Sequence, residues 1–397
     1  MSEGPSSMDQ AGDDSTAMDH ARWLRDASAN DGESVREEDL RTRVAPTMRA
    51  TQGWDDVDSF CRSLAGDDAS MTGVRDDGDD AIIDVLTPGG LRLERILRVD
   101  ADGRLASITP RLAGGASMTM ISAAAWRAAH LAYDDPVVLD DSYAGGLVGD
   151  ASPYQADAVR AGTHGTTGLH YRWNMVARSR FAEDTLAARR SSHGTTQYVV
   201  LGAGLDTFAL RNPFDDVTVF EVDTPASQAW KLERMATLGI EAPDDVHYVS
   251  CDFEEQDFAD RLEGSGFDET KPAVAAWLGV SYYLTEPAIR ATLERVGSWP
   301  AGTAIVFDYT LAEHRWDEFQ GFDADAMRAA LAGVAAAGEP FRSLFDDDEL
   351  VELCRSCGFD DVELLSHDDM RSRFMPGRSD PTPGPDPILK LACASVR

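Results

Sequence analysis

Two glycines, Gly202 and Gly204, stand directly after an apolar run in the segment QYVVLGAGLDTFALR, residues 197–211. The apolar run predicts a buried strand that ends at Leu201. Glycines at this point let the backbone turn sharply into a helix with no Cβ over the turn, so the backbone can approach a bound nucleotide. Dinucleotide-binding proteins use a similar turn, but they prefer a third glycine where this chain has Thr207.

Acidic side chains follow the next two apolar runs. VTVFEVDTP contains Glu221 and Asp223, which share one face of a strand because strand side chains alternate. An acid at this strand end accepts hydrogen bonds from ribose hydroxyls in nucleotide-binding folds, and either residue could serve. Asp252 and Phe253 come directly after VHYVS, where a carboxylate can accept from an adenine amino group while the ring packs against the base.

The segments LGAGLDT, EVDTP, CDF and WLGVSYYLT, in that order, resemble the class I S-adenosylmethionine-dependent methyltransferases of the leucine carboxyl methyltransferase-like family. That family includes many bacterial members of unassigned substrate. The resemblance covers residues 118–397. It implies an enzyme that uses S-adenosylmethionine and an α/β, Rossmann-like fold with a doubly wound, mostly parallel sheet of seven strands.

The resemblance also implies roles for single residues. An arginine in the helix before the sheet holds the cofactor's carboxylate, here Arg178 in ARSRFAED, and the glycine turn contacts the cofactor through its backbone. The ribose-binding acid matches Asp223 rather than Glu221. The predicted cofactor-binding residues are Arg178, Gly202, Gly204, Asp206, Glu221, Asp223, Asp252 and Phe253.

One position departs from the family pattern. The eukaryotic carboxyl methyltransferase branch has an acidic residue before the Gly-Val pair, whereas this chain has Leu278. Cofactor binding is expected to survive that change. Methylation of a leucine carboxyl group does not follow for this protein.

Methyl transfer from a sulfonium is an in-line displacement, so the protein mainly holds the acceptor atom about 3–3.5 Å from the methyl group. We expect a small-molecule acceptor that reacts through oxygen. A carboxylate acceptor needs no general base, whereas a hydroxyl acceptor would benefit from one. Tyr283 is the predicted catalytic residue, and His170, Tyr171 and Tyr282 are further candidates.

No metal site is expected. His164, His170 and His193 lack the spacing of metal ligands. Cys354 and Cys357 form a CxxC, but it lies inside a helical pattern and no second ligand pair follows.

Seven apolar runs bounded by turn residues predict the strands of the sheet. Helical stretches separate most of them at intervals typical of right-handed crossovers, and the last strands are expected to pair antiparallel at one edge. Helices are predicted over residues 122–133 and 168–190 and from 346 to 357. The family resemblance implies that residues 122–160 and 316–321 cover the acceptor pocket. The predicted strands are residues 197–201, 217–222, 246–250, 273–280, 303–309, 362–365 and 388–396.

The N-terminal part has a different composition. Residues 1–50 are rich in Asp, Ser and Gly and predict a flexible acidic tail, with some helix near residues 35–48. Residues 51–115 predict a small α+β or β-rich appendage, because Pro-Gly-Gly and Asp-Ala-Asp-Gly mark turns between antiparallel strands. The sequence assigns no role to this appendage.

The chain carries 70 acidic and 36 basic residues, a formal charge of −34. Such a surface repels a phosphate backbone, so no nucleic-acid partner is expected. No apolar run reaches the roughly 18 residues of a membrane-spanning helix, and no signal segment is present, so we expect a cytoplasmic protein with no membrane partner. Five dispersed cysteines fit a reducing compartment. The oligomeric state is not predicted.

Two other functions use the same motifs. A nicotinamide-dependent dehydrogenase would use a similar glycine turn and acidic strand end, but Thr207 and the pair Asp252–Phe253 disfavour it. A cofactor-binding scaffold without catalysis, with the N-terminal appendage as a protein contact, would differ from an enzyme only in lacking turnover.

Overall fold

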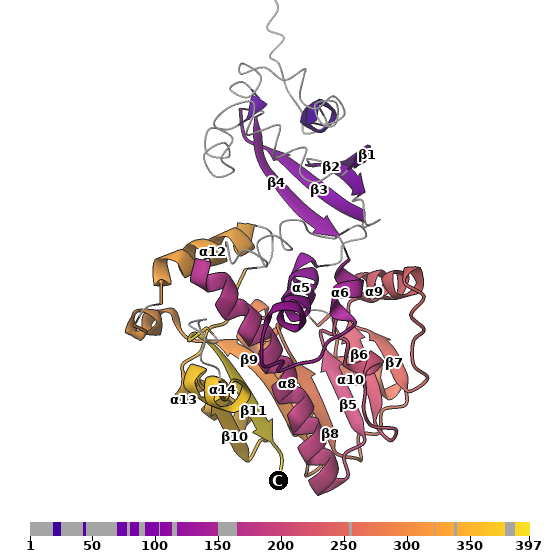
Figure 1. Ribbon diagram of the computed structural model, residues 1–397, viewed down its shortest axis with the longest axis vertical. Helices are drawn as coiled ribbons and strands as arrows, with labels where there is room; N and C mark the ends of the chain where they lie inside the picture. Colours follow the sequence, from indigo (N-terminus) through magenta and orange to yellow (C-terminus); the bar gives the residue numbers. More distant parts are fainter. Residues whose placement is uncertain are drawn as a thin grey trace, which may run out of the picture. The chain divides into compact units, whose positions relative to one another are not determined.

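The computed structural model describes residues 19–24, 43–44, 70–77, 80–86, 92–102, 104–112, 117–149, 165–253, 256–320, 322–336, 340–377 and 386–397. The chain divides into two compact units, residues 1–113 and 114–397 (Figure 1). The predicted tail over residues 1–50 lies outside the described residues except at 19–24, which is helical, and at 43–44. Nearly all of the helix expected near residues 35–48 also lies outside them.

The first unit contains a four-stranded antiparallel meander in the order β1-β2-β3-β4. The two predicted turns, Pro-Gly-Gly and Asp-Ala-Asp-Gly, fall between β2 and β3 and between β3 and β4. The strands of the meander are β1 (Ser70–Asp77), β2 (Asp80–Leu86), β3 (Arg92–Val99) and β4 (Leu105–Leu112).

The second unit is built on a seven-stranded sheet in the order β10-β11-β9-β8-β5-β6-β7. The strands from β9 to β7 pair in parallel, and β11 runs antiparallel to both of its neighbours. The predicted doubly wound, mostly parallel sheet is confirmed. Its strands are β5 (Gln197–Leu201), β6 (Thr218–Asp223), β7 (Val246–Ser250), β8 (Ala273–Trp277), β9 (Ala304–Thr310), β10 (Asp361–Leu365) and β11 (Leu389–Ser395).

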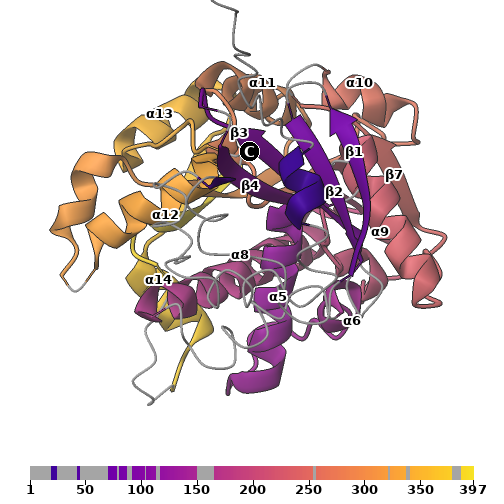
Figure 2. The same ribbon diagram turned by 90° about the horizontal axis from the view of Figure 1, so that it is seen from above.

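Helices cover both faces of this sheet, because alternate strand residues are buried against different helices. Val200 packs in the cluster that includes α8 and α14, and Val199 in the cluster that includes α10, α11 and α13. Figure 2 shows these two groups of helices on opposite sides. The helices are α5 (Met118–Tyr133), α6 (Ala144–Val148), α8 (Gly165–His193), α9 (Pro225–Thr237), α10 (Phe258–Glu263), α11 (Glu286–Gly297), α12 (Ala324–Ala336), α13 (Asp347–Ser356) and α14 (His367–Phe374), with 3₁₀ helices η2 (Phe208–Leu210), η3 (Ser281–Tyr283) and η4 (Glu313–Glu318).

Two local predictions were wrong. Residues 202–217, all of which the structure describes, contain only the short helix η2 and no α-helix between β5 and β6. Pro213 disfavours helical backbone at Asn212, so the helix cannot extend beyond one turn. The strand predicted to reach residue 280 ends at Trp277, because Gly279 adopts a positive φ of 77°.

The strand order places a ligand crevice beside β5. From β5 the chain continues outward through β6 and β7, then crosses to the other side of β5 and continues through β8 and β9. In open α/β sheets, ligands bind outside the carboxyl ends of the strands at such a reversal. The residues that follow β5, β6 and β8 are therefore the ones that can form a site.

A chain that starts at residue 114 should fold by itself, since the second unit has its own sheet and its own buried clusters on both faces. We expect a single cooperative unfolding transition, measured by circular dichroism during thermal denaturation. A truncated protein that aggregates or melts without a transition would show that the second unit depends on residues 1–113.

Candidate functional site

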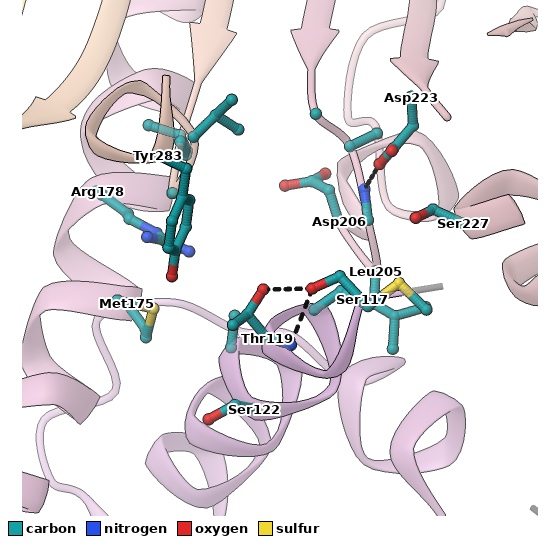
Figure 3. Close-up of a pocket in the computed structure, with 18 of the residues that line it drawn as sticks. Ser117, Thr119, Ser122, Met175, Arg178, Leu205, Asp206, Asp223, Ser227 and Tyr283 are labelled. Carbon is teal, nitrogen blue, oxygen red and sulfur yellow. Dashed lines mark hydrogen bonds between the residues drawn. The ribbon is translucent and has the colours of Figure 1, made fainter. Parts of the chain in front are cut away.

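A cavity of about 810 Å³ opens at the carboxyl ends of β5, β6 and β8. This volume lies within the range of about 300–1,000 Å³ that small-molecule sites occupy. Its walls come from α5, α8, the turns that follow these strands and residues 340–342. Figure 3 shows Arg178 and Asp223 on opposite sides of this pocket, with the first turns of α5 along a third side.

The turn after β5 forms one side of the cavity. Gly202 and Gly204 have positive φ angles of 71° and 49°, and both line the cavity. The backbone N–H groups of Gly202 and Ala203 donate to the carbonyl of Val222 at 2.8 and 3.1 Å. A Cβ on Gly202 would lie 2.4 Å from Cγ2 of Val280, so only glycine fits here.

Asp223 lies at the end of β6 and lines the cavity. Its Oδ2 accepts from the N–H of Gly204 at 2.5 Å (Figure 3). Its Oδ1 accepts from the N–H of Thr224 at 2.6 Å. Thr224 caps the N-terminus of α9, with Pro225 in the first turn, and this fixes the chain direction after the strand. Burial raises the pKa of the Asp223 carboxyl above its usual value, although both N–H donors stabilise the charged form.

The structure separates the two ribose candidates that the sequence left open. Glu221 is buried, and its Oε2 pairs with Nζ of Lys231 on α9 at 2.6 Å. The same Nζ donates to the carbonyl of Asp206 at 2.6 Å. Glu221 is not among the lining residues, whereas Asp206 is. Glu221 therefore connects α9 to the glycine turn, and Asp223 is the acid that faces the cavity.

Sequence reasoning missed the contact that holds α5 to the glycine turn. Arg127 of α5 lines the cavity, pairs with Asp141 at 2.7 Å and donates to the carbonyl of Leu205 at 2.6 Å. The hydroxyl of Thr207 donates to Asp141 at 2.7 Å. Burial alone would raise the pKa of Asp141, but Arg127 and Thr207 hold it below its usual value. Thr207 therefore anchors the turn where dinucleotide-binding proteins have a glycine.

Arg178 of α8 lies at the opposite side of the cavity, beside the loop after β8. Its Nη1 donates to Oδ2 of Asp308 at 2.8 Å, and both side chains are buried. Burial disfavours its charge, but Asp308 and Tyr282 more than offset this and raise the pKa of Arg178. The guanidinium is held beside Gly279, where a Cβ would lie 2.8 Å from Nη1.

Of the two residues predicted to contact adenine, one lines the cavity and the other does not. Phe253 lines the cavity and packs against the core cluster on the α10 side of the sheet. Asp252 is half-buried and is not among the lining residues.

Aromatic rings form the wall beside η3. Tyr282, Tyr283 and Phe341 all line the cavity, and Phe341 stacks on Tyr282 at a centroid distance of 4.3 Å and meets Tyr283 edge-on at 5.1 Å. The hydroxyl of Tyr283 points into the pocket beside Arg178 (Figure 3). Tyr171 also lines the cavity, whereas His170 does not.

Only part of the predicted cover is found at the cavity. Ser122 and Trp126 of α5 line it, but residues 150–160 lie outside the described ranges. Trp316 is buried in the core and donates its indole N–H to the carbonyl of Leu311 at 2.8 Å. Residues 340–342 line the cavity, whereas residues 316–320 do not.

The described part of the chain contains no cluster of three or more His, Cys, Asp or Glu that could hold a metal ion. Cys354 and Cys357 are both buried, and burial raises the pKa of the Cys354 thiol to about 12. None of the helices within the described ranges combines the length and apolar character needed to cross a bilayer.

The sheet, the glycine turn after its first strand and the acid at the end of the next strand define a class I S-adenosylmethionine-dependent methyltransferase. The family model described as leucine carboxyl methyltransferase matches residues 120–297. The chain belongs to the leucine carboxyl methyltransferase-like family of S-adenosylmethionine-dependent methyltransferases.

Two bacterial relatives agree with this assignment. A Bacillus subtilis (strain 168) protein with the provisional name S-adenosyl-L-methionine-dependent methyltransferase is 31% identical to this chain over 288 residues. The alignment covers 66% of this chain and 93% of that protein. A Mycobacterium sp. (strain JLS) protein with the same provisional name is 31% identical over 251 residues, 60% of this chain and 78% of that protein. A provisionally named methyltransferase structure from Thermobifida fusca has 15% identity and a TM-score of 0.43, covering 69% of this chain and 94% of that one.

The residues present fit this cofactor. The glycine turn lines one side of the cavity without side chains at Gly202 and Gly204, and Asp223 presents its carboxylate on the same side. Arg178 presents a buried positive charge on the opposite side, as a ligand with a nucleoside at one end and a carboxylate at the other requires.

Replacing Gly202 by alanine should destabilise the protein more than the same change at Gly239. Both residues have φ near 70°, which costs an alanine about 1 kcal/mol or more. The new Cβ at Gly202 also meets Val280, which adds about 1–3 kcal/mol, whereas nothing lies within 4 Å at Gly239. Free energies of unfolding from urea titrations measure the difference, and equal losses would contradict the close packing over the turn.

Proposed function

We propose that this protein transfers a methyl group from S-adenosylmethionine to an oxygen atom, in a carboxylate or a hydroxyl, of a small-molecule acceptor. The observation that carries the proposal is a single cavity with the glycine turn and Asp223 on one side, Arg178 on the other and aromatic rings on a further wall. Such a cavity can hold a nucleoside with an amino-acid tail and leave space beside it for a second molecule.

Four residues bind the cofactor in this proposal. Asp223 accepts hydrogen bonds from the ribose hydroxyls, and Phe253 packs against the adenine. Gly202 lets the backbone come close, and Arg178 donates to the carboxylate. When bound, the cofactor supplies a methyl group on a positively charged sulfur. The protein then holds the acceptor in line with that group and excludes water, which supplies much of the rate by proximity and orientation.

The lining of the cavity favours a carboxylate acceptor over an amine. Among the described lining residues the carboxylates are Asp206 and Asp223, both on the side of the glycine turn, and no histidine lines the cavity. An amine acceptor would have to lose a proton, and the wall beside η3 offers no carboxylate or imidazole to receive it. A carboxylate acceptor is already deprotonated at neutral pH, so it needs no such group.

Tyr283 is the proposed contact for a hydroxyl acceptor. Burial raises the pKa of Tyr171 and of Tyr282 above the usual value, so both hydroxyls remain protonated and neither can act as a general base. Tyr283 is less buried than Tyr282 and directs its hydroxyl into the pocket. It can therefore orient an acceptor oxygen against the methyl group.

The acceptor class can be tested with cofactor that carries a radiolabelled methyl group. We expect transfer to members of a panel of small acids and alcohols and none to their amine counterparts. Treating the product with alkali distinguishes the two oxygen acceptors, because a methyl ester releases volatile methanol and a methyl ether does not. Transfer only to amines would contradict oxygen methylation. Tight binding of cofactor without transfer to any acceptor would favour a scaffold.

Asp223→Ala should raise the dissociation constant for S-adenosylmethionine, because the ribose hydroxyls lose their acceptor. The expected loss is about 1–3 kcal/mol, measured by isothermal titration calorimetry. Asp252→Ala, which changes a side chain that does not line the cavity, should have a smaller effect. An unchanged affinity in the Asp223 variant would remove Asp223 from the site.

A further inference from the structure

Asp308, on β9, is a buried carboxylate that joins two parts of the cavity wall without lining it. Its Oδ2 accepts from Nη1 of Arg178 at 2.8 Å, and its Oδ1 accepts from the backbone N–H of Gly279 at 2.6 Å. Its side chain is 5% exposed, so water contributes little to either contact. One carboxylate therefore fixes both an arginine of α8 and the loop after β8.

The loop that Asp308 holds leads directly to the aromatic wall. Gly279 is followed by η3, which carries Tyr283, and the hydroxyl of Ser281 donates to the backbone carbonyl of Asp308. Gly279 also packs against the guanidinium of Arg178, since an added Cβ would lie 2.8 and 2.9 Å from its two terminal nitrogens. The position of the arginine and the position of the loop are thus set together.

The ion pair between Asp308 and Arg178 also fixes the orientation of the Arg178 guanidinium before a ligand binds. A buried guanidinium without a counter-ion is strongly unfavourable, and Asp308 supplies the counter-ion from within the protein. Arginine has five N–H donors, and Asp308 and Tyr282 engage only some of them. The remaining donors can bind a carboxylate in the cavity in an orientation that is already fixed before binding.

We propose that Asp308 is the positioning residue that holds Arg178 toward the amino-acid end of the cofactor and ties it to the loop that carries Tyr283. This inference rests on the proposed function, in which Arg178 binds the cofactor's carboxylate. Asp308 acts only through Arg178 and Gly279, so its loss should affect the amino-acid end of the cofactor and leave the nucleoside end unchanged.

The test compares a ligand with the amino-acid tail and one without it. S-adenosylmethionine has the tail on a positively charged sulfur, whereas 5′-methylthioadenosine keeps the nucleoside but has a neutral sulfur and no tail. S-adenosylhomocysteine, which has the tail on a neutral sulfur, is the control for the sulfur charge and should lose affinity as S-adenosylmethionine does. Asp308→Asn should raise the dissociation constant for S-adenosylmethionine by roughly 10- to 100-fold, as expected for a charged hydrogen bond. Its dissociation constant for 5′-methylthioadenosine should change by less than about twofold. Both values come from isothermal titration calorimetry.

Three variants make the result specific. Arg178→Gln should give the same selective loss, and adding Asp308→Asn to it should cause no further loss, because the two residues act as a unit. Asp134→Asn is the matched control: Asp134 is also buried and also pairs with an arginine, Arg172 at 2.8 Å. It should leave the ratio of the two dissociation constants unchanged even if it lowers the melting temperature.

Asp308→Glu serves as a second variant in case the asparagine variant does not fold, since it keeps the charge but displaces it by one methylene. A selective loss of S-adenosylmethionine in either variant supports the inference. One contrary result is a ratio of the two dissociation constants that stays unchanged in both Asp308 variants while it changes in Arg178→Gln. That result overturns the role of Asp308 and leaves the role of Arg178 intact. Failure of the wild-type protein to bind S-adenosylmethionine would overturn the proposed function itself.

Discussion

The geometry of the site depends on how the backbone turn after β5 is fixed to the neighbouring strand. Two consecutive N–H groups, of Gly202 and Ala203, donate to one carbonyl of β6, and the N–H of Gly204 donates to the carboxylate of Asp223. The carboxylate that holds the turn is thus also the one that faces the cavity. Any movement of the turn would therefore move the acid with it, and the two cannot be varied independently.

Buried cations hold the same turn from both sides. Arg127 of α5 donates to the carbonyl of Leu205, and Lys231 of α9 donates to the carbonyl of Asp206, the next residue along the chain. Each cation is neutralised by its own buried acid, Asp141 and Glu221 respectively. The chain has only three lysines against a formal charge of −34, and one of them is used here. Each of these two buried pairs is neutral, so neither adds to the net negative charge of the protein.

Structural features that depend on neighbouring residues in the chain, such as strands and the turns after them, could be predicted from the sequence. Apolar runs gave the strands to within a few residues, and the residues just after them, Gly202, Asp223 and Phe253, do line the cavity. What could not be predicted depends on partners far away in the chain. Arg178 and Asp308 are 130 residues apart, and Arg127 and Leu205 are 78 apart. No local pattern marks such a pair, and an aspartate in the run TAIVFDY reads as an ordinary strand end.

The short helix η2 bears on which nucleotides this crevice can accept. In dinucleotide enzymes the glycine turn leads into an α-helix, whose N-terminal N–H groups and dipole stabilise a pyrophosphate. Here the turn leads into three residues of 3₁₀ helix, and Asp206 and Asp223 place negative charge beside it. The described residues after this turn therefore offer no α-helix N-terminus to stabilise a diphosphate linkage. This difference fits a nucleoside ligand without phosphate, as in the proposed function.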